Sequence, residues 1–502
     1  LWGANAVNGV INIITRSAKH TTGGVLSGGG GKEERGFGSA RYGAALGAGG
    51  DYRVWGKYFD QDAQFHPTGD AYDAWHMYRG GFRADWDLKS AATLMVQGTL
   101  YGGQAGRRTT FAAYDPPFVR TVEGDAGLSG GHLHSKWTKP LREGSEVSVQ
   151  AYYDRTHRDE PNFREDRHTF DLDGQYQARL PGRQQLVAGV GYRFSHSRTD
   201  GPPTVAFEPP ARGDDLFSAF VEDSLEVAPD RLQLTLGTKL EWNDYSGFEW
   251  QPSARVGWSL HADHFFWGAL SRTVRTPSRL DHDLAITVAA SATTPIFFRV
   301  LGTPSFEAER AVVYEAGYRY RLGDRALLDL AAFHNHYPNL SSIEPAPPFR
   351  EPGRQVFPFQ IANGLDAKVS GAELSVELRP TSGWRLRGGY ALLDMSVRPR
   401  PGSRDTTSSS AAGANPRHEA TASSSWTLPR GLLVDAWYRW VGPRPSRSVD
   451  PYSEVDAHVA WRVGTHLELA AGGLNLLHPH HVEYANAVAI ERSIYGEAKW
   501  RW

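Results

Sequence analysis

The sequence predicts a transmembrane antiparallel β-barrel of about 22 strands. Three observations lead to this fold class. Nearly every strand-like segment has one apolar and one polar face, and short and long connections alternate along the 502 residues. In addition, no apolar run approaches the roughly 18 to 20 residues that a membrane-spanning helix needs. Together they favour a closed sheet with two unlike ends.

The strand-like segment 231–242 shows the two-faced pattern most clearly. One face carries Leu232, Leu234, Leu236, Leu240 and Trp242, and the other carries Arg231, Gln233, Thr235, Lys239 and Glu241. Only a period of two separates the residues in this way, because successive side chains of a strand point to opposite faces. The same alternation recurs in 314–320, 372–379 and 455–463. We therefore expect apolar residues to face lipid and charged residues to face a wet lumen.

The connections predict which rim each loop occupies. Short connections rich in Gly, Pro and Asp fall at 47–50, 180–183, 228–230, 322–325, 380–383, 428–431 and 464–465. Longer connections fall at 60–73, 103–126, 156–165, 198–213, 273–309, 337–356, 397–413, 442–451 and 477–489. In a closed up-and-down sheet every second connection emerges at the same rim. The tight turns are therefore predicted at one rim and the long loops at the other.

Composition agrees with a barrel and excludes several other classes. The mean hydropathy of −0.47 would suggest a soluble protein, but alternating strands cancel in a window average. A net charge of −2 gives no basis for nucleic-acid binding, and the absence of Cys excludes disulfides, thiolate metal sites and thiol nucleophiles. No catalytic motif, metal signature or cofactor motif stands out, so we predict neither an enzyme nor a resident cofactor.

The first sixteen residues, Leu1 to Arg16, read LWGANAVNGVINIITR. Read alone, Val10 to Ile14 predicts a short buried strand that follows bends at Gly3 and Gly9. The whole segment resembles the end of the plug domain of TonB-dependent outer-membrane receptors. Stretches similar to this family recur in order at 271–279, 304–318, 369–373, 415–418 and 473–477.

The resemblance implies a domain division and a set of partners. Residues 1–20 are expected to be the C-terminal end of a truncated plug, and residues 21–502 the transmembrane barrel. The chain is interpreted as a fragment because it opens without an initiator Met and without the family's TonB-engaging box. Expected partners are the TonB energy-transducing complex, outer-membrane lipid and lipopolysaccharide, and a small-molecule or metal-chelate ligand, with no nucleic acid. The expected location is the bacterial outer membrane.

The final strand alternates Ile494, Gly496, Ala498, Trp500 and Trp502 on one face. These residues are predicted to face lipid. A terminal aromatic residue on a last amphipathic strand is similar to the assembly signal of outer-membrane barrels, which the resemblance assigns to Trp500 and Trp502.

Two groups of loop residues are candidate ligand contacts. His478, His480 and His481 are close enough to ligate a transition metal or a haem iron, although a polar outer loop also accounts for them. Arg275 and Arg279 offer charge-assisted hydrogen bonds to an anionic chelate, or they pair with nearby acids or with lipopolysaccharide phosphates. His334 and His336 share one strand face, and a wet lumen or rim position explains them without a metal.

The resemblance and the pattern together predict a receptor that takes up a scarce ligand, such as a ferric siderophore or another metal complex. The alternatives are a passive porin-like channel and, from a different class, a soluble all-β carbohydrate-active enzyme. Tight turns are expected toward the periplasm and long loops toward the medium. The loop 273–309 is the first place to look for ligand contacts.

Overall fold

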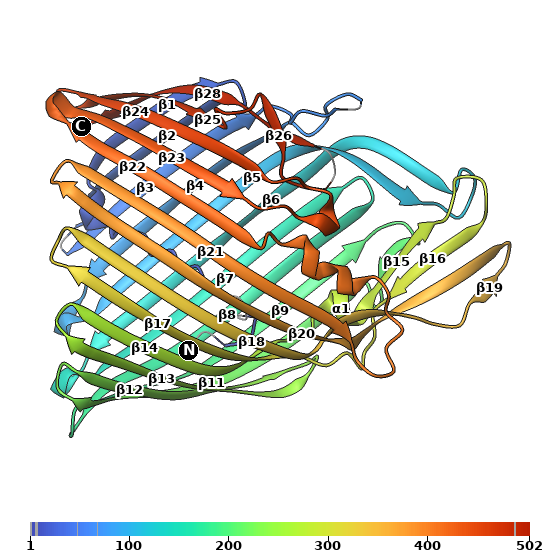
Figure 1. The fold of residues 1–502 in the computed structure, drawn as a ribbon, viewed down its shortest axis with the longest axis horizontal. Coiled ribbons are helices and arrows are strands. Elements are labelled where there is room, and N and C mark those ends of the chain that lie inside the picture. Colours follow the sequence, from blue (N-terminus) through green and yellow to red (C-terminus); the bar gives the residue numbers. More distant parts are fainter. Residues whose placement is uncertain (1–2, 6–8, 48, 68, 486–487) are drawn as a thin grey trace.

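The computed structural model describes residues 3–5, 9–47, 49–67, 69–485 and 488–502. These residues form a closed barrel of 22 antiparallel strands, with shorter strands added at one end (Figure 1). Within the described residues, no helix is long and apolar enough to cross a membrane. The predicted fold class is confirmed.

The barrel strands follow one another around the wall in chain order. They are β1 Gly23–Gly31, β2 Glu34–Ala45, β3 Gly50–Gln61, β4 Trp75–Asp87, β5 Thr93–Ala112, β6 Val119–Pro140, β7 Glu146–Glu160, β8 Phe163–Leu180, β9 Gln184–Asp200, β11 Ala211–Ala228, β12 Leu232–Asn243, β13 Gly247–His261, β14 His264–Arg275, β17 Glu309–Leu322, β18 Ala326–Pro345, β20 Arg354–Thr381, β21 Trp384–Pro399, β22 His418–Leu428, β23 Leu432–Val441, β24 Tyr452–Val463, β25 Leu467–Leu474 and β28 Ser493–Arg501.

The remaining elements lie on the connections. The extra strands are β10 Val205–Phe207, β15 Leu284–Ala289, β16 Ile296–Leu301, β19 Phe349–Glu351, β26 His480–Val482 and β27 Ala489–Glu491. The helical turns are η1 Ala18–Thr21, η2 Lys89–Ala91, η3 Arg142–Gly144, α1 Arg279–Asp283, η4 Ser408–Ala414, η5 Pro429–Gly431 and η6 Pro445–Arg447.

The barrel closes between its first and last strands. β1 pairs with β2 on one side and with β28 on the other, in a register that runs from Val25 opposite Arg501 to Gly31 opposite Tyr495. Closure leaves no free sheet edge along the wall, which a membrane requires because lipid cannot satisfy backbone hydrogen bonds.

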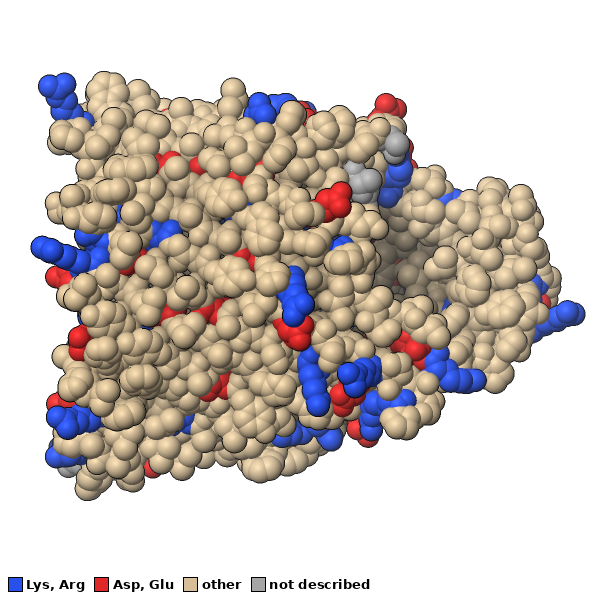
Figure 2. Space-filling view, viewed as in Figure 1, with Lys and Arg blue, Asp and Glu red and all other residues tan. Residues whose placement is uncertain are grey.

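The two faces of β12 point as the alternation predicts. Leu236 is 52% exposed and Trp242 is 47% exposed on the outer surface, whereas Glu241 and Asn243 are both 4% exposed on the lumen side. Figure 2 shows the result over the whole wall: charged side chains are sparse over the middle of the barrel and gather toward its two ends. The wall is therefore built to meet lipid in its middle band.

All seven predicted tight turns lie at one rim, at the left of Figure 1. Their chemistry follows from backbone angles that few residues adopt freely. Asp230 has a φ of 55° and Gly464 a φ of 68°, and Asp and Gly tolerate this left-handed region better than most residues. We refer to this end as the turn rim and to the opposite end as the mouth.

Two loops predicted at the mouth are largely strand. β5 and β6 stay paired from Thr93 opposite Thr138 out to Ala112 opposite Val119, so most of the predicted loop 103–126 is a hairpin extension. Likewise β7 and β8 leave only Pro161 and Asn162 as a turn, in place of the loop 156–165. Polar outer sequence concealed these strands, because beyond the membrane both faces of a strand tolerate water.

An arm projects from one side of the mouth, at the right of Figure 1. In it β10 pairs with β15, β15 with β16, and β16 runs parallel to the mouthward end of β20. A small buried cluster of Ala112, Phe118 and Phe297 joins this arm to the extended β5–β6 hairpin.

The last strand presents the face that the sequence predicts. Ile494, Trp500 and Trp502 are 65%, 46% and 55% exposed on the outside. On the other face, Lys499 Nζ lies 3.4 Å from Glu497 Oε1 in the lumen. The assembly role of Trp500 and Trp502 stays a prediction.

Candidate functional site

An apolar patch covers one wall of the lumen near the mouth. Its buried residues are Ala311, Val313, Tyr337, Ala367 and Val369, and Phe333, Leu340, Leu393, Met395 and Val397 pack against them. They come from the middle and mouthward parts of β17, β18, β20 and β21. Elsewhere the lumen side of these strands is charged, as at Glu373 and Glu377 on β20. The patch is thus a local exception to a polar interior.

The apolar patch faces a cavity of about 850 Å³ inside the barrel. Lys239, Arg255 and Trp267 also line this cavity, from β12, β13 and β14, the strands that follow β17 around the wall, and Ser408 and Ala411 of the η4 loop border it. A cavity of this volume is within the range of about 300 to 1,000 Å³ that is usual for small-molecule sites. It is the candidate ligand site.

The cations of the cavity are paired with acids of the wall. Lys239 Nζ lies 3.3 Å from Glu241, the Arg255 guanidinium lies 3.6 Å from Glu222, and Arg272 lies 3.2 Å from Glu249. This part of the cavity is therefore polar, but it has no large excess of positive charge. The apolar patch is what distinguishes the cavity from the rest of the lumen.

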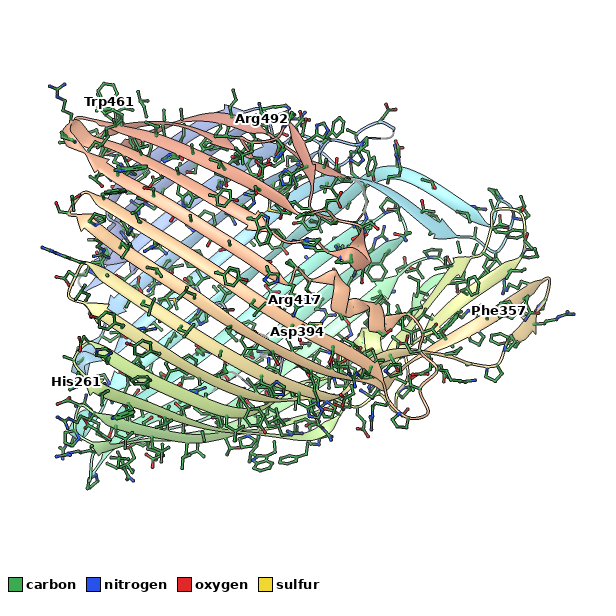
Figure 3. The ribbon with its side chains drawn as sticks, in the orientation of Figure 1. His261, Phe357, Asp394, Arg417, Trp461 and Arg492 are labelled. Carbon is green, nitrogen blue, oxygen red and sulfur yellow. The ribbon has the colours of Figure 1, made fainter. Side chains whose placement is uncertain are left out.

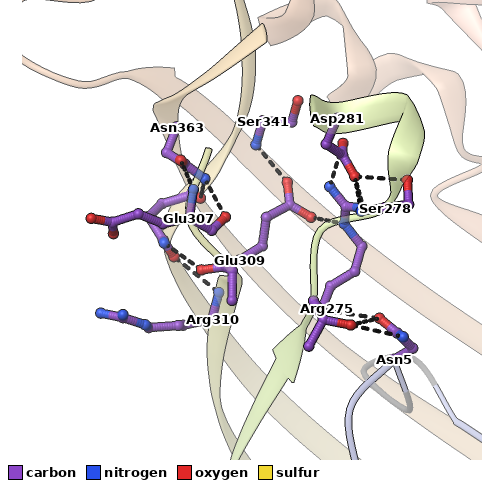
Figure 4. Close-up of polar contacts among 12 residues, drawn as sticks. Asn5, Arg275, Ser278, Asp281, Glu307, Glu309, Arg310, Ser341 and Asn363 are labelled. Atoms are coloured by element: carbon purple, nitrogen blue, oxygen red, sulfur yellow. Dashed lines mark hydrogen bonds and ion pairs between the residues drawn. The ribbon is translucent and has the colours of Figure 1, made fainter. Parts of the chain in front are cut away.

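A hydrogen-bonded network closes the mouthward edge of the cavity (Figure 4). Arg275 donates to both oxygens of Asp281, at 3.0 and 3.1 Å, and also to Glu309 on the neighbouring strand. The second oxygen of Glu309 accepts from the backbone N–H of Ser341. This network ties α1 to β14, β17 and β18.

Asp281 is ionised in this network. Burial raises the pKa of its carboxyl, but hydrogen bonds from Arg275 and Ser278 outweigh burial and hold the pKa below its usual range. Asp281 and Ser278 also form a capping box at the start of α1, which satisfies backbone donors there.

Arg279 is engaged even more fully than Arg275. Only 4% of Arg279 is exposed, and its guanidinium donates to Asp283 at 3.1 Å, to Ser197 Oγ at 2.9 Å and to the carbonyl of Pro209. The structure thus brings both candidate arginines into one region near the mouth and directs their donors at neighbouring groups of the protein. Ligand contact by Arg275 or Arg279 stays a prediction that requires these bonds to rearrange.

The three candidate histidines divide into two environments. His478 Nδ1 lies 2.8 Å from Glu454, and His481 lies between Glu454 at 3.2 Å and Glu483 at 2.7 Å. The ring of His480 instead stacks on Phe65, with 4.3 Å between ring centroids. Among the described residues, no group of three or more His, Cys, Asp or Glu side chains is arranged to hold a metal ion.

The other two histidines lie on the outside of the barrel. His334 pairs with Tyr314, which is 51% exposed on the outer wall, and His336 is two residues further toward the mouth. His334 Nδ1 lies 2.8 Å from Ser370 Oγ, and His336 Nε2 lies 3.1 Å from Asp366. The lumen position that the sequence left open is therefore wrong, because the lumen face of this stretch of β18 carries Asn335 and Tyr337.

The N-terminal segment crosses the lumen. The backbone N–H of Ala4 donates to Glu241 on β12 at 2.8 Å, whereas Arg83 on β4 donates to the carbonyl of Thr15 at 3.0 Å. These two strands are seven strands apart around the closed wall of 22. Near the turn rim, the N–H of Ala18 donates to Asp85 at 2.7 Å.

The strand predicted at Val10–Ile14 is wrong. These residues have no regular secondary structure, and Ile11, Ile13 and Ile14 are 91%, 80% and 84% exposed. The carbonyls that follow are bound by arginine side chains of the wall rather than by a neighbouring strand: Arg53 donates to Arg16 and Arg83 to Thr15. Residues 1–2 and 6–8 of the segment lie outside the described residues.

Asp405 anchors the loop that borders the cavity. Its carboxylate accepts from the backbone N–H groups of Ile343, Thr407 and Ser408, at 2.7, 2.8 and 2.9 Å. Burial raises the pKa of Asp405, but these hydrogen bonds and one from the Ser408 hydroxyl outweigh burial and lower the pKa to about 2.

Sequence reasoning missed the apolar patch, although β20 carries a signal for it. In the half of β20 near the turn rim, the even positions Leu374, Val376 and Leu378 are apolar. The odd positions there are polar: Glu373, Ser375, Glu377 and Arg379. Nearer the mouth the phase reverses, and the odd positions Leu365, Ala367 and Val369 are apolar. Such a reversal marks a strand that leaves the membrane and turns its apolar side inward.

A family model described as "TonB dependent receptor-like, beta-barrel" matches residues 15–476. Two curated relatives are also similar. The "Probable TonB-dependent receptor BfrD" of Bordetella pertussis is 23% identical over 358 residues, which cover 62% of this chain and 46% of that protein. The "Ferric enterobactin receptor" of Pseudomonas aeruginosa is 23% identical over 301 residues, which cover 55% of this chain and 39% of that protein. The matches span less than half the length of either relative.

Solved structures share the fold. The siderophore receptor PirA from Acinetobacter baumannii superposes with a TM-score of 0.79 at 14% identity, covering all of this chain and 83% of that one. A variant of the ferric enterobactin receptor PfeA from Pseudomonas aeruginosa in complex with enterobactin has a TM-score of 0.77 at 17% identity, covering 100% of this chain and 84% of that one.

Proposed function

Because this chain belongs to the TonB-dependent receptor family, whose barrel model matches residues 15–476, we propose that it takes up a scarce ligand, such as a ferric siderophore or another metal complex. The chain lies in the bacterial outer membrane. Its family consists of receptors and transporters rather than enzymes. Membership favours this function over the porin-like channel and the soluble carbohydrate-active enzyme.

The domain division is part of the proposal. Residues 1–20 are the C-terminal end of a plug, and residues 21–502 form the barrel, with β1 beginning at Gly23. The contacts of Ala4 with β12 and of Thr15 with β4 support this division, because they hold the segment inside the lumen. Coupling to the TonB complex follows from the family and is proposed for the whole protein.

One observation carries the ligand class: an apolar patch faces a cavity of about 850 Å³ within an otherwise polar lumen. A chelate that encloses its metal in an organic scaffold presents apolar or aromatic surface together with polar oxygens. In this proposal the scaffold contacts Tyr337 and Val369, and the oxygens face Lys239 and Arg255, which line the same cavity. The similar proteins named as siderophore and ferric enterobactin receptors support the same class.

The proposal is tested by titrating ferric enterobactin into the purified protein in detergent while following tryptophan fluorescence, which Trp267 at the cavity reports. We expect saturable quenching. Tyr337→Ala, on the patch, is expected to weaken binding by about tenfold, or ~1.4 kcal/mol.

The matched control is Tyr314→Ala, which removes a tyrosine ring from the outer face of the neighbouring strand. It is expected to leave the affinity unchanged. Equal weakening by both variants would place the ligand elsewhere. A failure of both ferric enterobactin and a ferric hydroxamate chelate to bind would overturn the siderophore class.

A further inference from the structure

The charged side chains that line the cavity are balanced in number but not in pairing. They are Lys239, Arg255, Arg272, Glu309, Glu315 and Glu373. Each of the three cations lies 3.2 to 3.6 Å from a carboxylate of the wall, and Glu309 is bound by Arg275. Among the described residues that line the cavity, no cation is therefore left to neutralise an anionic ligand.

Glu315 and Glu373 carry the unpaired charges of the cavity. Both carboxylates are exposed in the lumen, and within the described part of the chain neither forms an ion pair or a hydrogen bond. An exposed acid of the outer wall behaves differently: Asp394 has the Arg417 guanidinium 3.4 Å away, beside which it is labelled in Figure 3. The charge left over at the cavity is thus negative.

This charge separates two kinds of ferric chelate. A ferric tris-catecholate is triply anionic, because each catecholate brings two negative charges to a trivalent metal. In the cavity it would meet cations that are already neutralised and two free charges of its own sign, which repel it. A ferric tris-hydroxamate is electrically neutral, because each hydroxamate brings one negative charge. The cavity therefore favours the neutral chelate.

Asn335 places a hydrogen-bond acceptor inside the apolar patch. The strand register sets it opposite Val313 on β17 and Val369 on β20, both of them buried residues of the patch. Asn335 Nδ2 donates to Tyr337 Oη at 3.4 Å, whereas Asn335 Oδ1 is buried without a hydrogen-bond partner among the described residues. An unpaired buried acceptor costs free energy, so this oxygen suits an N–H or O–H donor of a ligand.

Thr273 adds a second polar group at the edge of the patch. It lines the same cavity and pairs in register with Ala311, a buried residue of the patch. The Thr273 hydroxyl is also buried without a partner among the described residues, and a hydroxyl both donates and accepts hydrogen bonds. The cavity thus combines apolar surface with uncharged hydrogen-bonding groups.

From these observations we propose that the ligand of the cavity is an electrically neutral ferric tris-hydroxamate chelate whose linkers carry amide N–H groups. This assignment rests on the proposed uptake function and narrows it to one class of chelate. The linker methylenes pack on Val313 and Val369, and a linker N–H donates to Asn335 Oδ1. Because the chelate has no net charge, it lies beside Glu315 and Glu373 without repulsion.

The first test is equilibrium dialysis of radiolabelled ferric chelates against the purified protein in a non-ionic detergent. Ferrichrome, a neutral tris-hydroxamate with amide N–H groups, is expected to bind at least tenfold more tightly than ferric enterobactin. Added sodium chloride is expected to strengthen ferric enterobactin binding, because salt screens the repulsion. Tighter or equal binding of ferric enterobactin would overturn the proposal, and so would a fall in its affinity with salt.

A double variant, Glu315→Gln with Glu373→Gln, isolates charge from the shape of the chelate. It is expected to narrow the preference for ferrichrome by about tenfold, through tighter binding of ferric enterobactin. This gain also shows that the variant is folded. The matched control is Glu146→Gln with Glu208→Gln, which removes the same charge from exposed residues outside the cavity. An unchanged preference in the first variant, or an equal change in both, would overturn the proposal.

Asn335→Leu tests the hydrogen bond, because it removes the acceptor while keeping a side chain of similar size. The affinity for ferrichrome is expected to fall about fivefold. His334→Leu, at the neighbouring outward position of β18, is the control and should bind ferrichrome as the unmodified protein does. Unchanged or tighter binding by Asn335→Leu would overturn the assigned contact.

The outcomes distinguish this inference from the uptake function on which it rests. Tighter binding of ferric enterobactin than of ferrichrome would overturn the neutral class and leave a siderophore receptor in place. Binding of neither chelate would overturn the siderophore class itself.

Discussion

Asn5 and Thr276 hold each other through two hydrogen bonds: Asn5 Nδ2 donates to Thr276 Oγ1 at 3.2 Å, and the Thr276 N–H donates to Asn5 Oδ1 at 3.1 Å. Thr276 directly follows Arg275, whose guanidinium binds Asp281 and Glu309. The N-terminal segment is therefore fastened to the residue next to the mouth network (Figure 4).

Asn5→Ala is expected to release the N-terminal segment from β14 while leaving the barrel intact. The loss of two hydrogen bonds costs about 1 to 3 kcal/mol locally, so the amide of Asn5, which donates to Val274 at 2.8 Å, should exchange faster in hydrogen–deuterium exchange. Asn12→Ala is the control, because Asn12 is exposed in the same segment. Unchanged protection of Asn5 in the first variant would show that the side chain does not hold the segment.

Arg275→Ala is expected to loosen the loop that contains α1. It leaves Asp281 and Glu309 without their shared cation, and removing one partner of a partly buried ion pair costs on the order of 3 kcal/mol. Faster exchange of the amides of 276–283 would report the change. Arg310→Ala, on the outer face one residue after Glu309, is the control and should leave this loop protected. Equal loosening by both variants would contradict the role of the network.

The anchor at Asp405 predicts a defined pH dependence. Its folded pKa of about 2 lies below the value of ~3.9 for an unfolded aspartate. Asp405 therefore stabilises its loop fully above about pH 4, and this contribution is lost as the pH falls from about 4 toward 2. Amide exchange of Thr407 and Ser408, corrected for intrinsic rates, should rise only in that window.

Asp405→Asn supplies the control for this titration. The amide exchange of the loop should already be fast at neutral pH in the variant, and it should lose the acid transition. Loss of protection in the unmodified protein between about pH 7 and 5 would assign the transition to another group.

Leu236→Arg is expected to destabilise the folded barrel by roughly 2 to 4 kcal/mol if the residue lies near the bilayer midplane, because the charge must enter lipid. Thr235→Arg should cost much less, since Thr235 faces the lumen, where its hydroxyl lies 3.0 Å from Ser224 Oγ. Denaturant unfolding in phospholipid vesicles measures both. Comparable losses of stability would contradict the assigned faces of β12.

The sequence alone determined the class of fold, the facing of strands such as β12 and β28, and the position of the turn rim. These features are local. Alternation depends on the period of two along one strand, and turns such as those at Asp230 and Gly464 depend on backbone angles that a few residues decide. The reversed phase of β20 is likewise a local feature of the sequence.

The tertiary structure alone decided how residues far apart in the chain meet. The closed wall decides which groups Arg275 and Arg279 bind and places His336 on the outer face. It also decides that Val10–Ile14 forms no strand. So does the pairing that converts most of the loop 103–126 into strand. The physical reason is that ion pairs and hydrogen bonds depend on distance in space. Val25 and Arg501 become neighbours only when the barrel closes.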